Sequence, residues 1–388
     1  MDVLISGAGI AGPAVAHWLA RAGHRPTIVE VAPRPRTGGQ AVDFRGPLHM
    51  GLLERMGVVE ALRAVETHGT AFRFVDEHGD RLMEWPAHLA GGDLEVRRGD
   101  LSRVLCAASK ATAYLFGDRI TALVEHPAGV DVTFASGTQR TFDLVIGADG
   151  VHSGVRRLAF GPEERFVKHL GYYVATWPVA NEWGDLGRTA LLHNSPGRMI
   201  SIGQDHRDPS RAGVFAAFAA PVLRYDRHDA GEQKAILRAT FAGLGWLTPR
   251  LLDALDAADD VYFDQICRVD APEWTRGRIA LLGDAACGAT IGGQGTGTAI
   301  VAAHVLAGEL AAAGGDHRVA FPRYRQRLAK FARGTQKGGD TTGRFLAPRT
   351  ARGIRLRNYL NNRQWFLDAT FKVAAGRSTD LQLPEYPI

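Results

Sequence analysis

The feature that most constrains the fold is an apolar run that passes directly into three glycines. Residues 3–6 are Val-Leu-Ile-Ser, and Gly7, Gly9 and Gly12 follow at the spacing of a G-x-G-x-x-G fingerprint. The pattern predicts a strand, a tight turn and a helix. In such a unit Gly7 permits the turn, Gly9 lets the backbone approach a pyrophosphate, and Gly12 lets the helix pack closely on the strand. Unpaired N–H groups at the helix start favour the same anion.

An acidic residue ends the same unit. The helix predicted over residues 14–22 stops at Gly23, and residues 27–30 form the expected second strand. Glu30 then lies where a carboxylate accepts from a ribose hydroxyl. A glycine triplet alone also fits a tight turn in an unrelated loop, and Glu30 also fits a surface carboxylate at a strand end. The strand, the helix and the acid about twenty residues further on together predict a dinucleotide-binding, Rossmann-like unit.

Three further motifs narrow this prediction. Residues 98–101 carry an R-x-D-L pattern, residues 147–156 carry G-A-D-G-x-x-S-x-x-R, and residues 283–286 are Gly-Asp-Ala-Ala, ahead of a Gly-Gln-Gly at 293–295. With these motifs the chain resembles the FAD-dependent group A monooxygenases of the para-hydroxybenzoate hydroxylase fold. Through the run Gly-Gly-Gln-Ala-Val-Asp-Phe-Arg-Gly at 38–46 it is most similar to the tetracycline-inactivating enzymes and aromatic polyketide hydroxylases of that group.

The resemblance implies an α/β protein, α+β overall, in which a Rossmann-like FAD-binding domain carries an inserted antiparallel-sheet substrate domain and a C-terminal helix. Short alternating runs at 172–177 and 214–218, broken by prolines, predict the antiparallel sheet. Such a sheet would cover a pocket against the flavin. We expect a discontinuous FAD-binding domain over residues 1–70, 93–165 and 267–335, a substrate domain over 71–92 and 166–266, and a C-terminal helical segment over 336–388.

The resemblance also implies roles for single residues. The three glycines of the fingerprint would face the FAD pyrophosphate, Glu30 the adenosine ribose and Arg98 the phosphate or ribityl region. Asp284 would accept from a ribityl hydroxyl, and Asp149 and Gly150 lie in a segment used for FAD and for a transient nicotinamide cofactor. Both aspartates also fit simple caps of the next turn or helix, and Arg98 also fits a solvated arginine. The cofactor-binding set is Gly7, Gly9, Ala11, Gly12, Glu30, Gln40, Arg45, Arg98, Asp149, Gly150, Asp284 and Gly295.

The loop after Asp284 departs from the family pattern. It has no proline and one residue fewer before the Gly-Gln-Gly, and in the family this loop passes the reactive edge of the flavin. We favour harmless variation, because glycine reproduces many backbone paths, but a loop that binds FAD and handles oxygen poorly stays open. Cys287 has no nearby histidine and is expected to be a small buried thiol. No catalytic residue is assigned; the candidates in this loop are Cys287, Thr290, Gly293, Gln294 and Gly295.

The middle of the chain offers candidates for a substrate-binding wall, although each also fits ordinary sheet core, where aromatic side chains are common. No His, Asp or Glu cluster there has hydrolytic spacing, so the chemistry is expected to come from the cofactor. The candidates are Trp177, His193, Met199, Phe215 and Phe218.

Composition restricts the location of the protein and the kinds of partner and metal site that we expect. The 388 residues are 45% hydrophobic and 22% charged, which suits two or three lobes. Three cysteines are too few for a disulfide framework or a zinc site, so we expect no metal and a reducing, cytoplasmic location. We expect no targeting peptide and no membrane span. The net charge of +5 is spread along the chain, which argues against nucleic acid. The densest basic run, 344–363, fits an anionic-partner site or, preferably, the solvated face of a C-terminal helix.

The sequence therefore predicts an FAD-dependent monooxygenase that uses NADPH or NADH and O2 to hydroxylate an aromatic or polyketide-type small molecule, in biosynthetic tailoring or in antibiotic inactivation. The unusual loop after Asp284 keeps open a redox-silent FAD-containing cyclase or pericyclase on the same fold. A protein that only sequesters a ligand is a third hypothesis. A monomer and a homodimer both remain compatible with the sequence.

Overall fold

The computed structural model describes residues 1–388 except 36–37, 88–91, 292–294, 338, 364 and 367–380. In its first sheet the strands at residues 2–6, 144–147 and 279–281 are apolar and almost entirely buried, as expected where both faces are covered. All neighbours in it are parallel except the outermost pair, β17 and β18. In spatial order the strands are β17 (Thr275–Arg276), β18 (Ile279–Leu281), β11 (Leu144–Gly147), β1 (Asp2–Ser6), β2 (Arg25–Glu30) and β7 (Ala113–Phe116).

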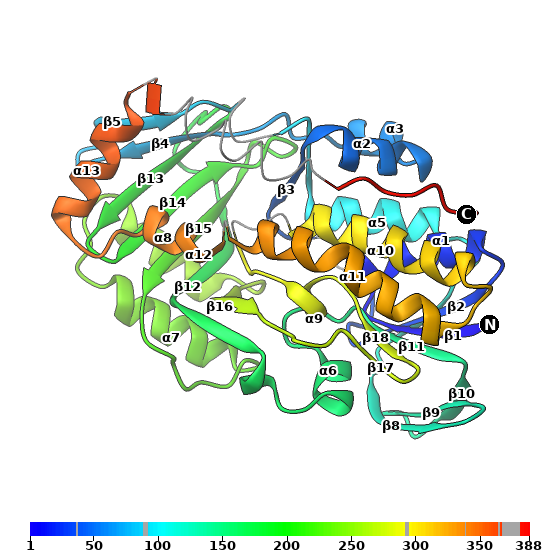
Figure 1. Ribbon diagram of the computed structural model, residues 1–388. Helices are drawn as coiled ribbons and strands as arrows, with labels where there is room; N and C mark the ends of the chain where they lie inside the picture. Colours follow the sequence, from blue (N-terminus) through cyan, green and yellow to red (C-terminus); the bar gives the residue numbers. More distant parts are fainter. Residues whose placement is uncertain (36–37, 88–91, 292–294, 338, 364, 367–380) are drawn as a thin grey trace.

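Different elements cover the two faces of this parallel sheet (Figure 1). One face packs against a layer of helices formed by α1 (Ala11–Arg21), α5 (Arg98–Ala108), α10 (Gly295–Ala312) and α11 (His317–Gln336). The other carries α6 (Gly154–Ala159) and a small antiparallel sheet of β8 (Ile120–His126), β9 (Gly129–Phe134) and β10 (Gln139–Phe142). The predicted strand–helix–strand unit is therefore present, with α1 three residues longer at its start than the sequence pattern indicates.

A second, larger sheet holds seven strands. Its order is β16 (Tyr262–Val269), β12 (Val167–Ala180), β15 (Arg211–Ala219), β14 (Arg198–Gln204), β13 (Thr189–Ser195), β4 (Ala71–Val75) and β5 (Arg81–Trp85). The sheet is antiparallel except where β13 and β4 run parallel. It unites segments 71–85 and 167–269, close to the predicted substrate domain, although β16 continues three residues past the expected boundary at 266.

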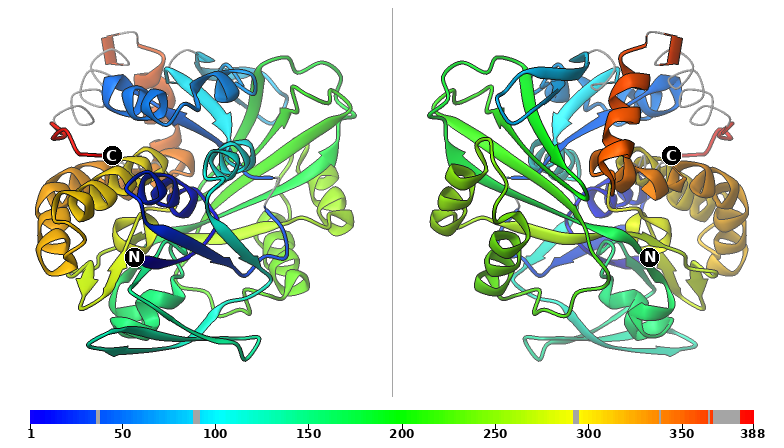
Figure 2. Two further views of the ribbon diagram at one scale, coloured as in Figure 1. Left: turned by 90° about the vertical axis from the view of Figure 1, so that its right-hand side faces the viewer. Right: turned by 90° about the vertical axis from the view of Figure 1, so that its left-hand side faces the viewer.

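Two helices in this region were not expected from the sequence. α7 (Ala230–Phe241) and α8 (Thr248–Ala257) pack on the outer face of the large sheet (Figure 2). Asp229 caps α7 by accepting from the Glu232 N–H, and a proline at the first turn starts α8. Region 171–266 is therefore a sheet with a helical layer behind it rather than a sheet alone.

The remaining elements connect the two sheets. β3 (Ala41–Phe44) pairs with β6 (Leu94–Arg97), and α2 (Gly46–Arg55) and α3 (Val59–Arg63) follow β3. The short helices η1 (Glu163–Arg165) and α9 (Asp284–Cys287) precede β12 and α10. α12 (Gly339–Leu346) and α13 (Ala351–Asn361) lie against the large sheet, and residues 381–388 return to the helical layer, where the Tyr386 hydroxyl donates to Glu309 at 2.8 Å. Both termini lie at the same end of the molecule (Figure 1).

α10 is the one described helix that is long and apolar enough to cross a membrane. In the structure 78% of it is buried, between α1, α2 and α11. Its composition is therefore accounted for by its place in the protein core, since a helix that is hydrophobic all round is typical of such a position.

Candidate cofactor site

The three glycines of the fingerprint differ in what surrounds them. Gly7 has a φ of +105°, and a Cβ there would lie 2.6 Å from the Ala148 carbonyl oxygen. A Cβ on Gly12 would lie 1.9 Å from the Gly7 carbonyl oxygen. A Cβ on Gly9 would meet no atom within 4 Å. Gly7 and Gly12 are thus required by the turn and by close packing, whereas Gly9 borders open space at the start of α1, where a pyrophosphate fits.

Glu30 orders this loop from the end of β2. Its Oε2 accepts from the Ala8 N–H at 2.7 Å, and its Oε1 accepts from the Ala32 N–H at 3.0 Å. Each carboxylate oxygen has a second lone pair, and the side chain is only partly buried. Glu30 can therefore hold the glycine loop and still accept from a ribose hydroxyl.

Asp284 presents a carboxylate that receives no hydrogen-bond donor from the part of the chain that the structure describes. It is the first residue of α9, after Gly283 with a φ of +62°. Within the described residues its side chain accepts no hydrogen bond, and burial raises its pKa while the charge of Arg98 lowers it. A Cβ on Gly295 would lie 3.2 Å from its Oδ1, so the start of α10 is close. The side chain is partly exposed, so its carboxylate oxygens can accept a hydrogen bond from a ribityl hydroxyl.

Asp149, at the end of the neighbouring strand β11, is already satisfied. Its Oδ2 accepts from the Val155 N–H at 3.1 Å and from the Ser6 hydroxyl at 3.2 Å, and Ser153 also donates to it. Its side chain thus caps α6 and secures the end of β1. Gly150 beside it has a φ of +79°, and a Cβ there would meet no atom within 4 Å. The carboxylate is therefore structural, and the partly exposed backbone at Gly150, which has open space beside it, is the part of this turn that can approach a ligand.

The adjacent residues Arg97 and Arg98 have different surroundings. Arg97 donates to Asp205, at 2.8 Å from its Nη1, and so joins β6 to the loop after β14. Arg98 has no acid within ion-pair distance among the described residues, is exposed, and lies against Gly39, where a Cβ would be 3.2 Å from its own. Its backbone N–H donates to the Gln40 carbonyl at 3.0 Å. Arg98 is thus a cation available to a phosphate.

Arg45, also predicted to bind the cofactor, lies just before α2 and pairs with Asp43. Ala11 is the first residue of α1 and is buried. No group of His, Cys, Asp and Glu suited to a metal ion occurs among the residues that the structure describes.

The loop after Asp284 is attached to strand β16. The Thr290 hydroxyl donates to the Gln265 carbonyl at 3.0 Å, and the Thr290 N–H donates to the Cys267 carbonyl at 3.1 Å. Cys287 is buried, its thiol lies 3.7 Å from the Gly283 carbonyl, and burial together with Asp284 raises its pKa. That thiol is not a nucleophile at neutral pH. Gly293 and Gln294 lie outside the described residues, and Gly295 begins α10.

The predicted substrate wall is divided by strand register. Trp177, His193 and Phe218 point to the outer face of the large sheet, where the Trp177 Nε1 donates to the Leu251 carbonyl of α8 at 3.1 Å and His193 stacks on Trp246. For these three the substrate prediction is wrong, because successive strand residues point to opposite faces. Met199 and Phe215 point to the inner face.

The inner face also contains aromatic residues that sequence reasoning missed. Phe345 of α12 stacks on Trp85 of β5 at 4.6 Å between ring centroids and meets Phe74 of β4 edge-on at 6.3 Å. The alternation of Phe72 with Phe74 and of Met83 with Trp85 was the available signal. The inner aromatic face comprises Phe74, Met83, Trp85, Tyr172, Met199, Phe215 and Phe345, and it packs against Ile291 of the loop after Asp284.

A parallel sheet with a glycine loop at one strand end, an acid on the next strand and, two strands away, a carboxylate with no donor among the described residues defines a dinucleotide-binding α/β protein. The family model described as FAD binding domain matches residues 1–320. The chain belongs to this family, and it is a flavin-dependent enzyme of the monooxygenase class that binds FAD.

The relatives agree with this assignment. An uncharacterized protein of Mycobacterium tuberculosis is 40% identical over 342 residues, which cover 86% of this chain and 91% of that protein. A flavin-dependent monooxygenase of Legionella longbeachae is 37% identical over 345 residues, covering 87% of this chain and 88% of that one. The crystal structure of tetracycline destructase Tet(51) matches with a TM-score of 0.87 and 32% identity and covers 99% of both chains.

Proposed function

We propose that this enzyme uses NADPH or NADH and O2 to hydroxylate an aromatic or polyketide-type small molecule. The observation that carries the proposal is that Ile291, in the loop after Asp284, packs against the inner aromatic face. The cofactor side of the molecule and an apolar, aromatic-rich surface therefore meet at one place, as a binding site for a flat, apolar substrate requires.

The residues of the chain have positioning roles in this proposal. FAD, when bound, would supply the redox and oxygen chemistry. Gly9 and the first turn of α1 would hold its pyrophosphate, Asp284 its ribityl chain and Arg98 a phosphate. The inner aromatic face would orient the substrate ring and exclude water, which protects a reactive oxygen species from loss before transfer.

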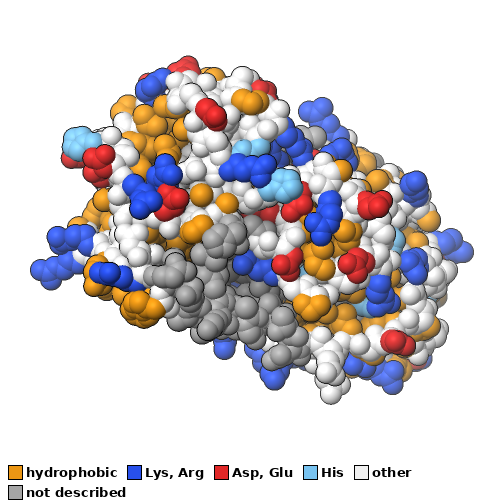
Figure 3. Space-filling model, turned by 90° about the horizontal axis from the view of Figure 1, so that it is seen from above, with side chains coloured by type: hydrophobic (Ala, Val, Ile, Leu, Met, Phe, Trp, Pro, Cys, Tyr) orange, Lys and Arg blue, Asp and Glu red, His pale blue; other side chains and the backbone are white. Residues whose placement is uncertain are grey.

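The polyketide class is supported by the likeness to a tetracycline destructase along the whole chain. Whether the enzyme tailors a biosynthetic product or inactivates an antibiotic is a matter of the substrate it meets, since both tasks use the same pocket. On the face seen in Figure 3, Lys and Arg side chains are scattered among acidic ones rather than gathered in one block, which fits a small-molecule substrate better than a polyanion.

The test is oxygen uptake and NADPH or NADH oxidation by the purified yellow protein with a panel of phenolic polyketides, tetracyclines included. We expect at least one compound to stimulate both and to gain one oxygen atom derived from isotopically labelled O2. If no compound stimulates oxygen uptake, the proposal fails. Product formation without oxygen and without reduced nicotinamide would instead select the redox-silent cyclase on the same fold.

A further inference from the structure

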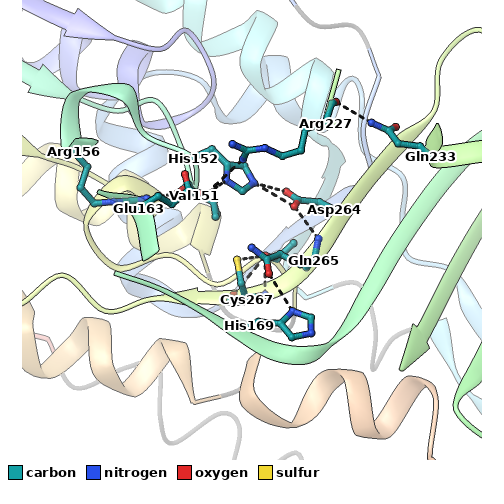
Figure 4. A network of polar contacts seen from close by, with 11 residues as sticks. Val151, His152, Arg156, Glu163, His169, Arg227, Gln233, Asp264, Gln265 and Cys267 are labelled. Atoms are coloured by element: carbon teal, nitrogen blue, oxygen red, sulfur yellow. Dashed lines mark hydrogen bonds and ion pairs between the residues drawn. The ribbon is translucent and has the colours of Figure 1, made fainter. Parts of the chain in front are cut away.

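A histidine outside the predicted site is held between two carboxylates (Figure 4). His152 lies in the turn between β11 and α6, two residues after Gly150. Its Nδ1 lies 2.9 Å from Glu163 Oε1, and its Nε2 lies 3.2 and 3.1 Å from the two oxygens of Asp264. All three side chains are mostly buried. Neither G-A-D-G-x-x-S-x-x-R nor the other motifs specify a residue of this kind at position 152.

The geometry sets the charge of this histidine. Ionised carboxylates only accept hydrogen bonds, so both ring nitrogens must carry a hydrogen, and the ring is an imidazolium. Burial opposes this charge, but the hydrogen bonds and charges of Asp264 and Glu163 outweigh burial and raise the pKa of His152 to about 9. The same contacts lower the pKa of Glu163 against its own burial.

The other charges around His152 come from two further elements. Arg227, from the segment before α7, lies 3.7 Å from Glu163 Oε1. Arg156 of α6 is fully buried and donates to the carbonyls of Ala285 and Val151 rather than to an acid. Two carboxylates thus face the imidazolium directly, and both arginines lie behind Glu163 or beside the turn.

The position of Asp264 links this contact to the cofactor site. Asp264 is on β16, the edge strand of the large sheet, whereas His152 belongs to the turn that follows β11 of the parallel sheet. Further along β16, the Val269 N–H donates to the Gly288 carbonyl at 2.9 Å and the Cys267 carbonyl accepts from Thr290 at 3.1 Å. One strand therefore holds the turn that carries Gly150 at one point and the loop after Asp284 at another.

We propose that His152 is a positioning residue: as an imidazolium between Glu163 and Asp264, it clamps the turn carrying Gly150 to β16 and so fixes that turn relative to the loop after Asp284, which shapes the FAD site. The inference rests on the FAD site and is independent of the substrate proposed above. Local contacts already order the turn itself through Asp149 and Ser153, so the clamp controls where the turn sits rather than whether it forms.

The first test replaces the carboxylate on β16. Asp264→Asn keeps the shape of the side chain and its acceptor for the Gln265 N–H but removes the charge that faces His152. We expect FAD to dissociate about tenfold more readily, the usual size of coupling between two linked contacts, with a changed flavin absorbance band. The matched control is Asp270→Asn, which removes an exposed carboxylate just beyond the same strand, paired with Arg268 at 2.8 Å, and is expected to leave FAD binding unchanged.

The second test reads the histidine directly in protein without FAD. Histidine-labelled protein followed by NMR is expected to show one imidazole that stays protonated up to a pH of about 9 and is absent in His152→Gln, and whose titration moves toward neutral pH in Asp264→Asn. The FAD affinity of the wild type should fall as pH rises through the same range, while that of His152→Gln should not change there. Glu163→Gln provides a second route to the same loss if Asp264→Asn does not fold.

Three results would overturn the proposal. His152 could titrate near its ordinary value, in which case the imidazolium does not exist at neutral pH. Asp264→Asn and Glu163→Gln could both bind FAD with wild-type affinity and spectrum, which would leave His152 with a merely local structural role. Asp270→Asn could weaken FAD binding as much as Asp264→Asn, which would assign the effect to β16 in general. The first outcome concerns the titration of His152 and the other two concern FAD binding, so all three are separable from failure of the hydroxylation assay.

Discussion

At the scale of residues, two aspartates with the same sequence context have opposite fates. Asp149 and Asp284 each follow an apolar strand, and the two strands are neighbours in the parallel sheet, with Val145 opposite Ile279. Asp149 is satisfied by Ser6, Ser153 and the start of α6, whereas the carboxylate of Asp284 receives no donor from the described residues. An acid after a strand is thus a cap in one case, and in the other we propose that it accepts a hydrogen bond from the cofactor.

Replacement of Asp284 should have opposite effects on FAD binding and on the stability of the protein without FAD. Asp284→Ala should weaken FAD binding by about 1–3 kcal/mol, the cost of losing a buried hydrogen bond to a charged acceptor. The same change should raise the melting temperature of the protein without FAD, because burial raises the pKa of Asp284 and an isolated buried carboxylate is unfavourable. Fluorescence titration with FAD and thermal unfolding of the apoprotein measure the two effects. A melting temperature that falls would mean that Asp284 has a protein partner.

Replacement of Gly9 and replacement of Gly12 should affect different properties, FAD affinity and stability respectively. Gly9→Ala places a methyl group in the open space at the start of α1, so the protein should fold normally and lose at least about tenfold in FAD affinity. Gly12→Ala places the methyl group 1.9 Å from the Gly7 carbonyl oxygen, so it should lower the stability of the protein itself. Circular dichroism and FAD titration of both variants distinguish a ligand contact from a packing contact. Equal losses of stability in the two variants would contradict this assignment.

At the scale of elements, the core helix α10 carries a histidine that makes stability depend on pH. His304 is fully buried between the rings of Trp18 and Tyr386, with its Nε2 3.3 Å from Arg55. Burial, together with the charges of Arg55 and Arg21, lowers its pKa from 6.5 to about 4. The folded protein therefore keeps this ring neutral at pH values where the unfolded chain binds a proton.

The sign of the effect follows from that difference. The stability contributed by neutral His304 is complete above pH 6.5 and is lost as pH falls toward 4, by up to about 3 kcal/mol at the lower limit. His304→Gln should flatten the fall in unfolding free energy over this range, measured by urea denaturation at several pH values. The exposed His78 is the matched control, and His78→Gln should leave the profile unchanged. An unaltered profile in His304→Gln would show that other groups control the acid sensitivity.

The elements also show how far sequence reasoning extends. The boundaries of β1, α1 and β2 were predicted to within three residues, because the signals of this unit are local: an apolar run, three glycines and an acid. The same holds for the positions of Asp149, Asp284 and Arg98 at strand or helix ends. α7 and α8 were missed because the region was interpreted by its alternating runs and prolines, although Asp229 and Pro249 are ordinary start signals for helices.

Prediction of the substrate-binding residues requires the strand register and the contacts between segments that are far apart in the sequence. A shift of one residue in strand register moves every side chain to the other face, so the sequence could not place Trp177 and Phe215 on opposite sides of one sheet. The aromatic face also combines β4 and β5 with α12, which lies far away in the sequence. His152 escaped attention for the same reason, since its partner Asp264 is 112 residues away.

At the scale of the whole molecule, the large sheet separates two cores with different tasks. The outer core, between the sheet and α7 and α8, contains Trp177 and Phe218 and stabilises the fold. The inner face meets α12, α13 and the loop after Asp284. Arg357 of α13 is buried there, with its guanidinium 4.1 Å from the Phe74 ring centroid, and burial lowers its pKa to about 10. The C-terminal helices thus complete the inner face of the sheet.

Because the two faces of the large sheet differ in this way, truncation of an inner aromatic residue should affect substrate binding, and truncation of an outer one should affect stability. Phe345→Ala removes the ring stacked on Trp85 from the partly exposed inner face. It should therefore raise the KM for a stimulating polyketide severalfold. FAD content and the substrate-independent oxidation of NADPH should stay at wild-type levels. Trp177→Ala removes a fully buried ring and its hydrogen bond to Leu251, so it should lower the unfolding free energy by about 3–5 kcal/mol. Steady-state kinetics of Phe345→Ala and denaturant unfolding of both variants measure these effects. The opposite result would be a Phe345→Ala variant that is destabilised as strongly as Trp177→Ala and has an unchanged KM. The inner face would then be a second structural core, and the substrate would have to bind elsewhere along the loop after Asp284.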